Sequence, residues 1–400
     1  ILNNGSSTTT LGSRNYIAGL NAGAAILSGG TDNVLIGENA GAAITTGDNN
    51  VAIGNYTLDA NEAGIFNVAV GNSALSANVN GHYNVAVGQS ALRLNTARSN
   101  TAVGFAALEE NTSGSELTAV GKSALTSNVG GSNNSAVGYF SLEGNTTGSH
   151  NTALGYNSLT YNTTAADNTA TGSAALHFNT TGIRNTAFGK SALGANITGG
   201  DNTAVGYGAL DAATTASDNT AVGRNALGAN TASNNTALGT NAMANSATGS
   251  LNVAVGGSAL SGNTSGSSNV AIGIYAMLSN TSGSSNIAVG RDVLRNNTYA
   301  QSSTAVGYQS LMNATTGGKN TTLGYQAGYA VTTGTRNVLL GNEAAASAVD
   351  ATNQVVIGDS IAGTANNQVS IGKSSNIVSN DFGTDATWTR SSDVRKKKNI

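Results

Sequence analysis

The sequence predicts an all-β protein, a parallel β-solenoid of about 20 coils with a 17-residue repeat. The phrase Asn-Thr-Ala-Val-Gly recurs along most of the chain, and 17 of the 21 intervals between its glycines are 17 residues long. β-branched residues alternate with small ones just before each glycine, which is typical of a short strand. Proline is absent, as expected where nearly every backbone N–H is needed for pairing. The fixed period indicates one stack of coils rather than several domains.

Each repeat is expected to contain one strand and one large apolar residue on the inside. Val51 and Ile53 flank Ala52, and we expect such flanking residues to face the interior. The glycine that follows marks a corner where a Cβ would collide or φ must be positive. The large apolar residue comes four positions after the glycine and should form a second internal row. Its members include Leu75, Leu92, Leu108, Leu125, Leu142, Leu159, Leu176, Leu193, Leu210, Leu227, Met243, Leu260, Met277, Leu294 and Leu311.

Small residues form two further rows, one at the middle of each strand and one just before the large apolar residue. The second row includes Ala74, Ala91, Ala107 and Ala124. We expect both rows on the opposite, outer face, where small side chains let a neighbouring protomer approach closely. A plain exposed alanine face is the alternative.

Asparagine also recurs in two rows, four residues before the glycine and seven after it. Asn50 and Asn67 belong to the first row, and Asn78 and Asn95 to the second. Stacked amides can bond from coil to coil, and Asn tolerates left-handed turns. We therefore predict two ladders in outer turns. Two coils have 16 residues, and the missing residue comes from the polar turn, at Asn95 to Ser99 in the first of them.

The spacing of the repeats divides the chain into four segments. We expect a lead-in at 1–14, the repeat shaft at 15–341, degenerate and shorter coils at 342–379, and a different segment at 380–400. The last segment contains the only Trp and a run of Arg and Lys. The chain begins without an initiator Met, so we expect it to be part of a longer protein.

Two resemblances follow from these motifs. The coils around Gly358 and Gly372, 14 residues apart, resemble the head repeats of trimeric autotransporter adhesins. That family implies a left-handed parallel β-roll assembled as a homotrimer. The 17-residue form, Asn-Thr-Ala-Val-Gly-Tyr-x-Ala-Leu, is more similar to arrays in phage tail-fibre proteins and covers most of the chain.

The residues 391–400, Ser-Ser-Asp-Val-Arg-Lys-Lys-Lys-Asn-Ile, resemble the start of the auto-cleaving intramolecular chaperone of phage tailspikes and tail fibres. In that family the chaperone trimerises the fibre and then cuts itself off between a Ser and an Asp. The resemblance implies that Ser392 and Lys397 are catalytic for this single self-cleavage, at the bond before Asp393. Lys396 stands where the family usually has an apolar residue. A lysine can deprotonate a serine hydroxyl only if burial lowers its pKa.

Composition and spacing argue against several function classes. A net charge of −3 gives no broad basic surface for nucleic acid, and no apolar run is long enough for membrane insertion. His82, His150 and His177 occupy three different repeat positions, which gives no metal ladder. Asp residues such as Asp32 and Asp201 are too sparse for a calcium β-roll. We expect no metal and no cofactor.

One aromatic row is a candidate receptor contact. An aromatic residue directly follows the glycine at Phe105, Tyr139, Tyr156, Tyr207, Tyr308 and Tyr325. Such a row can stack on sugars, and partial burial at a corner or between protomers is the alternative, which we favour from sequence.

The function we expect is structural and adhesive, the shaft of a phage tail fibre or tailspike that attaches to a host cell. Its partners would be its own copies and a host surface glycan or protein, and its location the virion tail, outside the cell. A bacterial trimeric surface adhesin is one alternative. An ice-binding solenoid is another, although Thr101, Thr118, Thr152 and Thr169 share a position with Val and Ile that we expect to be internal. An enzyme is disfavoured because no paired carboxylates recur in register.

Overall fold

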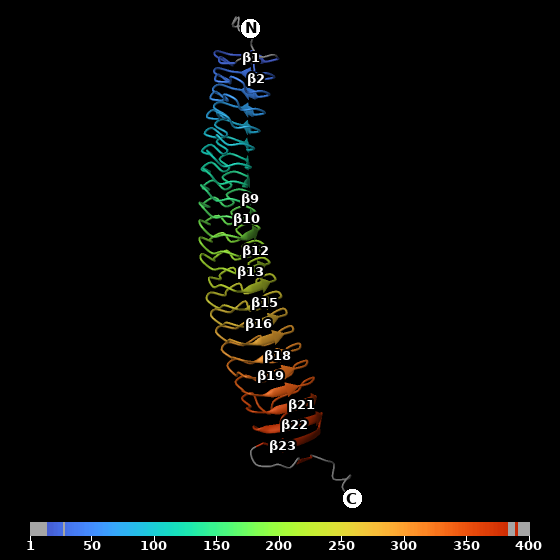
Figure 1. The fold of residues 1–400 in the computed structure, drawn as a ribbon. Helices are drawn as coiled ribbons and strands as arrows, with labels where there is room; N and C mark the ends of the chain where they lie inside the picture. The colour runs from blue at the N-terminus through green and yellow to red at the C-terminus, as the bar shows by residue number, and fades with distance from the viewer. Residues whose placement is uncertain (1–13, 27–28, 383–388, 391–400) are drawn as a thin grey trace, which may run out of the picture. The chain divides into compact units, whose positions relative to one another are not determined.

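The computed structural model describes residues 14–26, 29–382 and 389–390. The chain forms two compact units, Ile1–Asn202 and Thr203–Ile400. In both units the described residues form a parallel β-solenoid with a repeat of about 17 residues, and they contain no helix. Figure 1 shows the strands of each unit following one another in chain order. The predicted fold class is confirmed.

The first unit contains one three-residue strand per coil. Each strand pairs in parallel with its neighbours in an unshifted register, such as Val51↔Val68 and Ala52↔Ala69. The strands are β1 (Tyr16–Ala18), β2 (Val34–Ile36), β3 (Val51–Ile53), β4 (Val68–Val70), β5 (Val85–Val87), β6 (Thr101–Val103), β7 (Thr118–Val120), β8 (Ser135–Val137), β9 (Thr152–Leu154), β10 (Thr169–Thr171) and β11 (Thr186–Phe188).

The second unit continues with the same kind of coil and ends differently. Strands β12 to β22 pair in parallel, and β23 then reverses and pairs antiparallel with β22, from Gln368↔Asp381 to Lys373↔Asn376. The strands are β12 (Thr203–Val205), β13 (Thr220–Val222), β14 (Thr236–Leu238), β15 (Val253–Val255), β16 (Val270–Ile272), β17 (Ile287–Val289), β18 (Thr304–Val306), β19 (Thr321–Leu323), β20 (Val338–Leu340), β21 (Val355–Asp359), β22 (Gln368–Lys373), β23 (Asn376–Asp381) and β24 (Thr389–Arg390).

The repeated glycine is required for two reasons at once. Gly138 has φ of +136°, and a Cβ added to it would lie 2.5 Å from the carbonyl oxygen of Gly155 in the next coil. Both the positive φ and the close backbone approach exclude other side chains. The predicted corner is confirmed.

The predicted inner and outer faces of the strand are reversed. Ala52 and Ala69, at strand centres, are fully buried, whereas Ile53 is 38% exposed. The second small row, which includes Ala74 and Ala91, is also fully buried. The prediction that the two small rows form an outer face was therefore wrong, and so was the internal placement of the flanking residues. In most coils leucine side chains and asparagine amides already fill the narrow interior, and alanine is small enough to fit between them. Where the strand centre is the larger Leu35 or Leu339, a glycine, Gly41 or Gly328, lies against it in place of the usual large apolar residue.

The large apolar row lies inside as predicted, with Leu75, Leu92 and Leu108 fully buried. These leucines have positive φ, 52° for Leu75 and 51° for Leu92, which is a costly conformation for a leucine. The backbone N–H of Leu75 donates to the carbonyl oxygen of Ala91 at 3.0 Å, and that of Leu92 to Ala107 at 3.0 Å. Hydrogen bonds between coils therefore accompany this conformation at these leucines.

Both asparagine rows form ladders from coil to coil, but they lie inside rather than in outer turns. Asn67 is fully buried, its backbone N–H and its Nδ2 both donate to Oδ1 of Asn50, at 3.0 and 3.1 Å, and Nδ2 also donates to the carbonyl of Gly81 at 2.9 Å. In the second ladder Nδ2 of Asn145 donates to Oδ1 of Asn128 at 2.8 Å. The amides thus satisfy backbone groups that the turns would otherwise bury unpaired.

Candidate functional site

The outer side of the strands is an uncharged surface in each unit, which we call the strand face. It consists of the first and third residues of the three-residue strands, which point away from the buried central residue. From β2 to β11 and from β12 to β20 these positions hold only Val, Ile, Leu, Phe, Thr and Ser. Its exposed large apolar residues are Tyr16, Ile53, Val87, Val103, Val120, Val137, Leu154 and Phe188 in the first unit, and Leu238, Ile272, Ile287 and Leu323 in the second. Apolar surface repeated over many coils is typical of an interaction site.

The aromatic row of the first unit is a column of stacked groups. The rings of Tyr139 and Tyr156 are parallel within 6° with centroids 5.7 Å apart. The Nζ atom of Lys122 lies 5.5 Å from the centroid of Tyr139 and 5.8 Å from that of Phe105. Phe105, Lys122, Tyr139 and Tyr156 therefore follow one another in four consecutive coils, with the ammonium between two rings.

The second unit brings together two of the three remaining predicted aromatics. Tyr308 and Tyr325 stack at 5.5 Å with an angle of 17°. Tyr207 is exposed, and the equivalent residue of the next coil is Arg224. Across both units the six side chains are between 38% and 56% exposed, so they are available to a ligand.

Two further aromatic pairs were missed from the sequence. Phe66 and Tyr83 stack at 5.6 Å, and Tyr161 and Phe178 stack at 5.5 Å. His177 packs edge-on against Tyr161 at 5.0 Å. Each pair shares a repeat position in consecutive coils, and this register was the signal that could have revealed them.

The polar turns contain a surface hollow in each unit. The hollow of the first unit, about 350 Å³, lies over the 16-residue coil and is lined by Asn80, His82, Thr96, Arg98, Ser113 and Ser115 among others. The Nδ1 atom of His82 accepts a hydrogen bond from the backbone N–H of Ile65 at 3.1 Å. The hollow of the second unit, about 260 Å³, is lined by Tyr299, Gln301, Thr316, Lys319, Thr335 and Arg336, together with Gly318.

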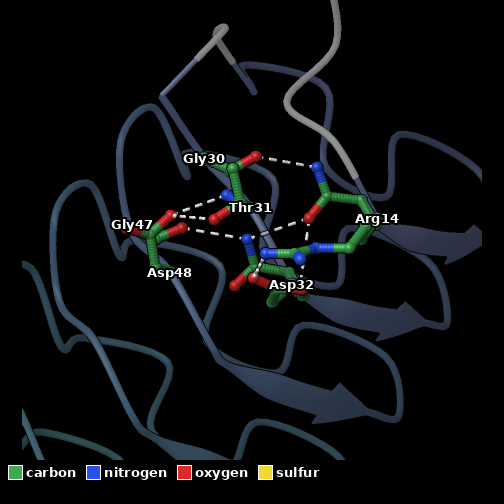
Figure 2. A network of polar contacts seen from close by, with 8 residues as sticks. Arg14, Gly30, Thr31, Asp32, Gly47 and Asp48 are labelled. Carbon is green, nitrogen blue, oxygen red and sulfur yellow. Dashed lines mark hydrogen bonds and ion pairs between the residues drawn. The ribbon is translucent and has the colours of Figure 1, made fainter.

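At the turn position five residues before the glycine, consecutive coils at the start of the first unit and at its end carry an Arg and an Asp that form ion pairs. Nη2 of Arg14 donates to Oδ2 of Asp32 at 2.7 Å (Figure 2). Beside this pair, the backbone N–H of Thr31 donates to Oδ1 of Asp48 at 2.6 Å. Arg184 and Asp201 form the same kind of pair at 2.6 Å, and the hydrogen bond from Arg184 lowers the pKa of Asp201. These Asp residues therefore link successive coils.

Among the described residues, no group of three or more His, Asp or Glu could hold a metal ion. No helix in the same part of the chain is long and apolar enough to cross a membrane. Ser392, Asp393 and Lys397, the predicted self-cleavage residues, lie outside the described residues.

No known protein-family model matches the chain, and neither does any curated protein sequence.

Proposed function

We propose that the chain is the shaft of an extracellular attachment fibre, assembled as a homotrimer through the strand face. The observation that carries this proposal is the uncharged strand face, which repeats coil after coil in both units. A solenoid whose own core is closed by alanine, leucine and asparagine has no internal use for exposed Val, Ile, Leu and Phe. A second copy would cover this surface and remove it from water.

The resemblance of the last ten residues to a phage fibre chaperone favours a phage tail fibre or tailspike. On this proposal the fibre belongs to the virion tail, attaches to a glycan or protein of the host surface, and matures by one cut before Asp393 that uses Ser392 and Lys397. A bacterial trimeric adhesin head is the alternative from the same class, and any sequence found after Ile400 would distinguish the two. An intramolecular chaperone there supports the phage fibre, and a coiled coil leading to a membrane barrel supports the adhesin.

The solution mass of the 400-residue chain, measured by light scattering, tests the assembly. We expect three times the 39.4 kDa of one chain. Replacing Val103, Val120 and Val137 together by Lys should give single chains, because it places three charges on adjacent coils of the strand face.

The matched control places the same three charges on another side of the same unit. Thr147, Thr164 and Thr181 are exposed turn residues at one repeat position, and their joint replacement by Lys should leave the mass unchanged. A wild-type mass of one chain would contradict the proposed assembly, and so would equal masses for the two triple variants.

One observation favours ice binding as a second candidate. The argument against it assumed that the Thr row is internal, and this was wrong, since Thr118, Thr152 and Thr169 are exposed on the strand face. The two candidates require the same surface, because a face covered by other protomers cannot meet ice. If the chain has the mass of a monomer and its solution shows thermal hysteresis, ice binding would therefore be favoured over the fibre.

A further inference from the structure

The hollow of the second unit lies over the turns that precede β18, β19 and β20. Tyr299 and Gln301 come from the first turn, Thr316 and Lys319 from the second, and Arg336 from the third. A volume of about 260 Å³ is slightly below the range of drug-sized pockets, so it fits one small ring rather than an extended ligand.

Lys319 and Arg336 stand at the same repeat position in consecutive coils, five residues before Gly324 and Gly341. Their backbone is fixed by bonds between coils, from the N–H of Lys319 to the carbonyl of Gln301 at 2.8 Å and from that of Arg336 to Gly318 at 3.2 Å. Adjacent strands are about 4.8 Å apart, so the two cations start from neighbouring points of the backbone.

Elsewhere this repeat position pairs a cation with an acid in the adjacent coil. Arg14 pairs with Asp32 in this way, and Arg184 with Asp201. The two coils that flank Lys319 and Arg336 instead have Ser302 and Asn353 at this position. The lining of the hollow contains no carboxylate, and neither cation forms an ion pair with another described residue. Two like charges side by side repel each other, and an anion between them would relieve that repulsion.

The other lining groups indicate what carries the anion. Tyr299 is 59% exposed, and its ring offers an apolar face. Gln301, Thr316 and Thr335 add an amide and two hydroxyl groups around it. A sugar ring matches this mixture, since its C–H face packs on an aromatic ring while its hydroxyls bond to amides and hydroxyls. A bare inorganic anion would use the cations and leave the tyrosine uncovered.

We propose that this hollow binds an anionic sugar unit, with its carboxylate, sulfate or phosphate between Lys319 and Arg336 and its ring on Tyr299. The inference rests on the proposed attachment function and names the chemical class of the glycan. Arginine and carboxylate or phosphate form paired hydrogen bonds, which fixes the orientation of the anion.

Calorimetric titration of the 400-residue chain tests this, with methyl β-D-glucuronide as the carboxylate probe and glucose 6-phosphate and glucose 6-sulfate as the alternatives. The neutral match is methyl β-D-glucoside, and inorganic sulfate is the bare anion. We expect at least one charged sugar to bind at least tenfold more tightly than both of these, and its affinity to fall with added salt. Lys319→Gln and Arg336→Gln should each weaken the binding of that sugar at least tenfold. Tyr299→Ala should weaken its binding more than Tyr299→Phe does.

Arg224→Gln is the matched control, because Arg224 is an exposed cation of the same unit at another repeat position. It should leave the affinity unchanged. The inference is overturned if no charged sugar binds, if inorganic sulfate binds as well as the sugars, or if Arg224→Gln weakens binding as much as Lys319→Gln. The solution mass separates this outcome from the fibre proposal. If the chain is a trimer but binds no charged sugar, only the sugar-binding inference is contradicted. If the chain is a monomer and binds a charged sugar, only the proposed trimer is contradicted.

Discussion

The buried asparagine ladder makes a quantitative prediction for Asn151→Ala. Asn151 is fully buried, and its Oδ1 accepts the backbone N–H of Asn168 at 3.1 Å, while its Nδ2 donates to Ala165 at 2.9 Å. Nδ2 also donates to Oδ1 of Asn134 at 3.2 Å, so alanine removes three bonds. Oδ1 of Asn134 keeps the backbone N–H of residue 151 as its donor, at 2.9 Å. The carbonyl of Ala165 keeps a second donor, Nδ2 of Asn162 at 3.0 Å, so only the N–H of Asn168 is left without a partner.

A buried donor without a partner costs about 1–3 kcal/mol, and the lost side-chain volume raises the total to about 2–4 kcal/mol. Because about 1.4 kcal/mol is a factor of ten, backbone hydrogen exchange in residues 145–170 should become about 30 to 700 times faster. Hydrogen exchange with mass spectrometry measures this directly, and it localises the effect to the coils that lost the amide.

Thr164→Ala is the control, because Thr164 is exposed in the turn between Asn151 and Asn168. Its effect should stay within about 0.5 kcal/mol. Equal exchange in the two variants would mean that the buried amide does not hold neighbouring coils together, and the argument for the ladder would fail.

Three further predictions concern single positions. Gly138→Ala should lower the melting temperature, followed by circular dichroism, far more than Gly257→Ala. The Cβ at position 138 would lie 2.5 Å from a backbone oxygen, whereas the Cβ at position 257 would meet nothing within 4 Å. Similar shifts would contradict the requirement for glycine at the corner. Ala136→Leu should destabilise by about 1–3 kcal/mol or more in denaturant titrations, whereas Val137→Leu on the strand face should change little, and the opposite order would mean that the strand is inverted. Burial raises the pKa of Asp59, so the folded state holds its proton more tightly and loses that stabilisation as pH rises. Asp59→Asn should therefore raise the melting temperature at pH 7 and leave it nearly unchanged at pH 3, and a shift independent of pH would refute this.

The sequence alone was sufficient to predict the period, the parallel stacking, the glycine corner and the leucine row. These features follow from residues with few alternatives, such as Gly138 and Leu142, whose roles depend on size and backbone freedom. The register of a repeat also places equivalent residues in contact, which is why the stack of Tyr139 and Tyr156 could be anticipated as a row.

The side of the strand that faces inward could not be predicted in the same way. Alternation with a period of two separates Val51 and Ile53 from Ala52, but it does not say which set is internal. The width of the interior decides, and that width depends on how Leu58 and Asn50 pack inside the coil. Hydrophobicity favours valine over alanine as a core residue, and here the steric limit outweighs it.

The positive φ of leucine and the hollow of the second unit were missed for another reason. A residue such as Leu75 is unfavourable in a left-handed turn by its own propensity, and only the bonds to the neighbouring coil offset that cost. Lys319 and Arg336 likewise look like scattered surface charges until consecutive coils are aligned. Both features depend on contacts between coils and not on the local sequence.

The antiparallel pairing of β22 and β23 has a consequence for length. A parallel ladder of identical rungs has no built-in reason to stop, since its last rung presents the same unpaired backbone groups as every rung before it. The reversed strand Asn376–Asp381 spaces its donors and acceptors differently, so another 17-residue coil cannot add onto it in the same register. The parallel ladder therefore ends at β22, and β24 pairs antiparallel with β23, at Val378↔Arg390 and Ser379↔Thr389.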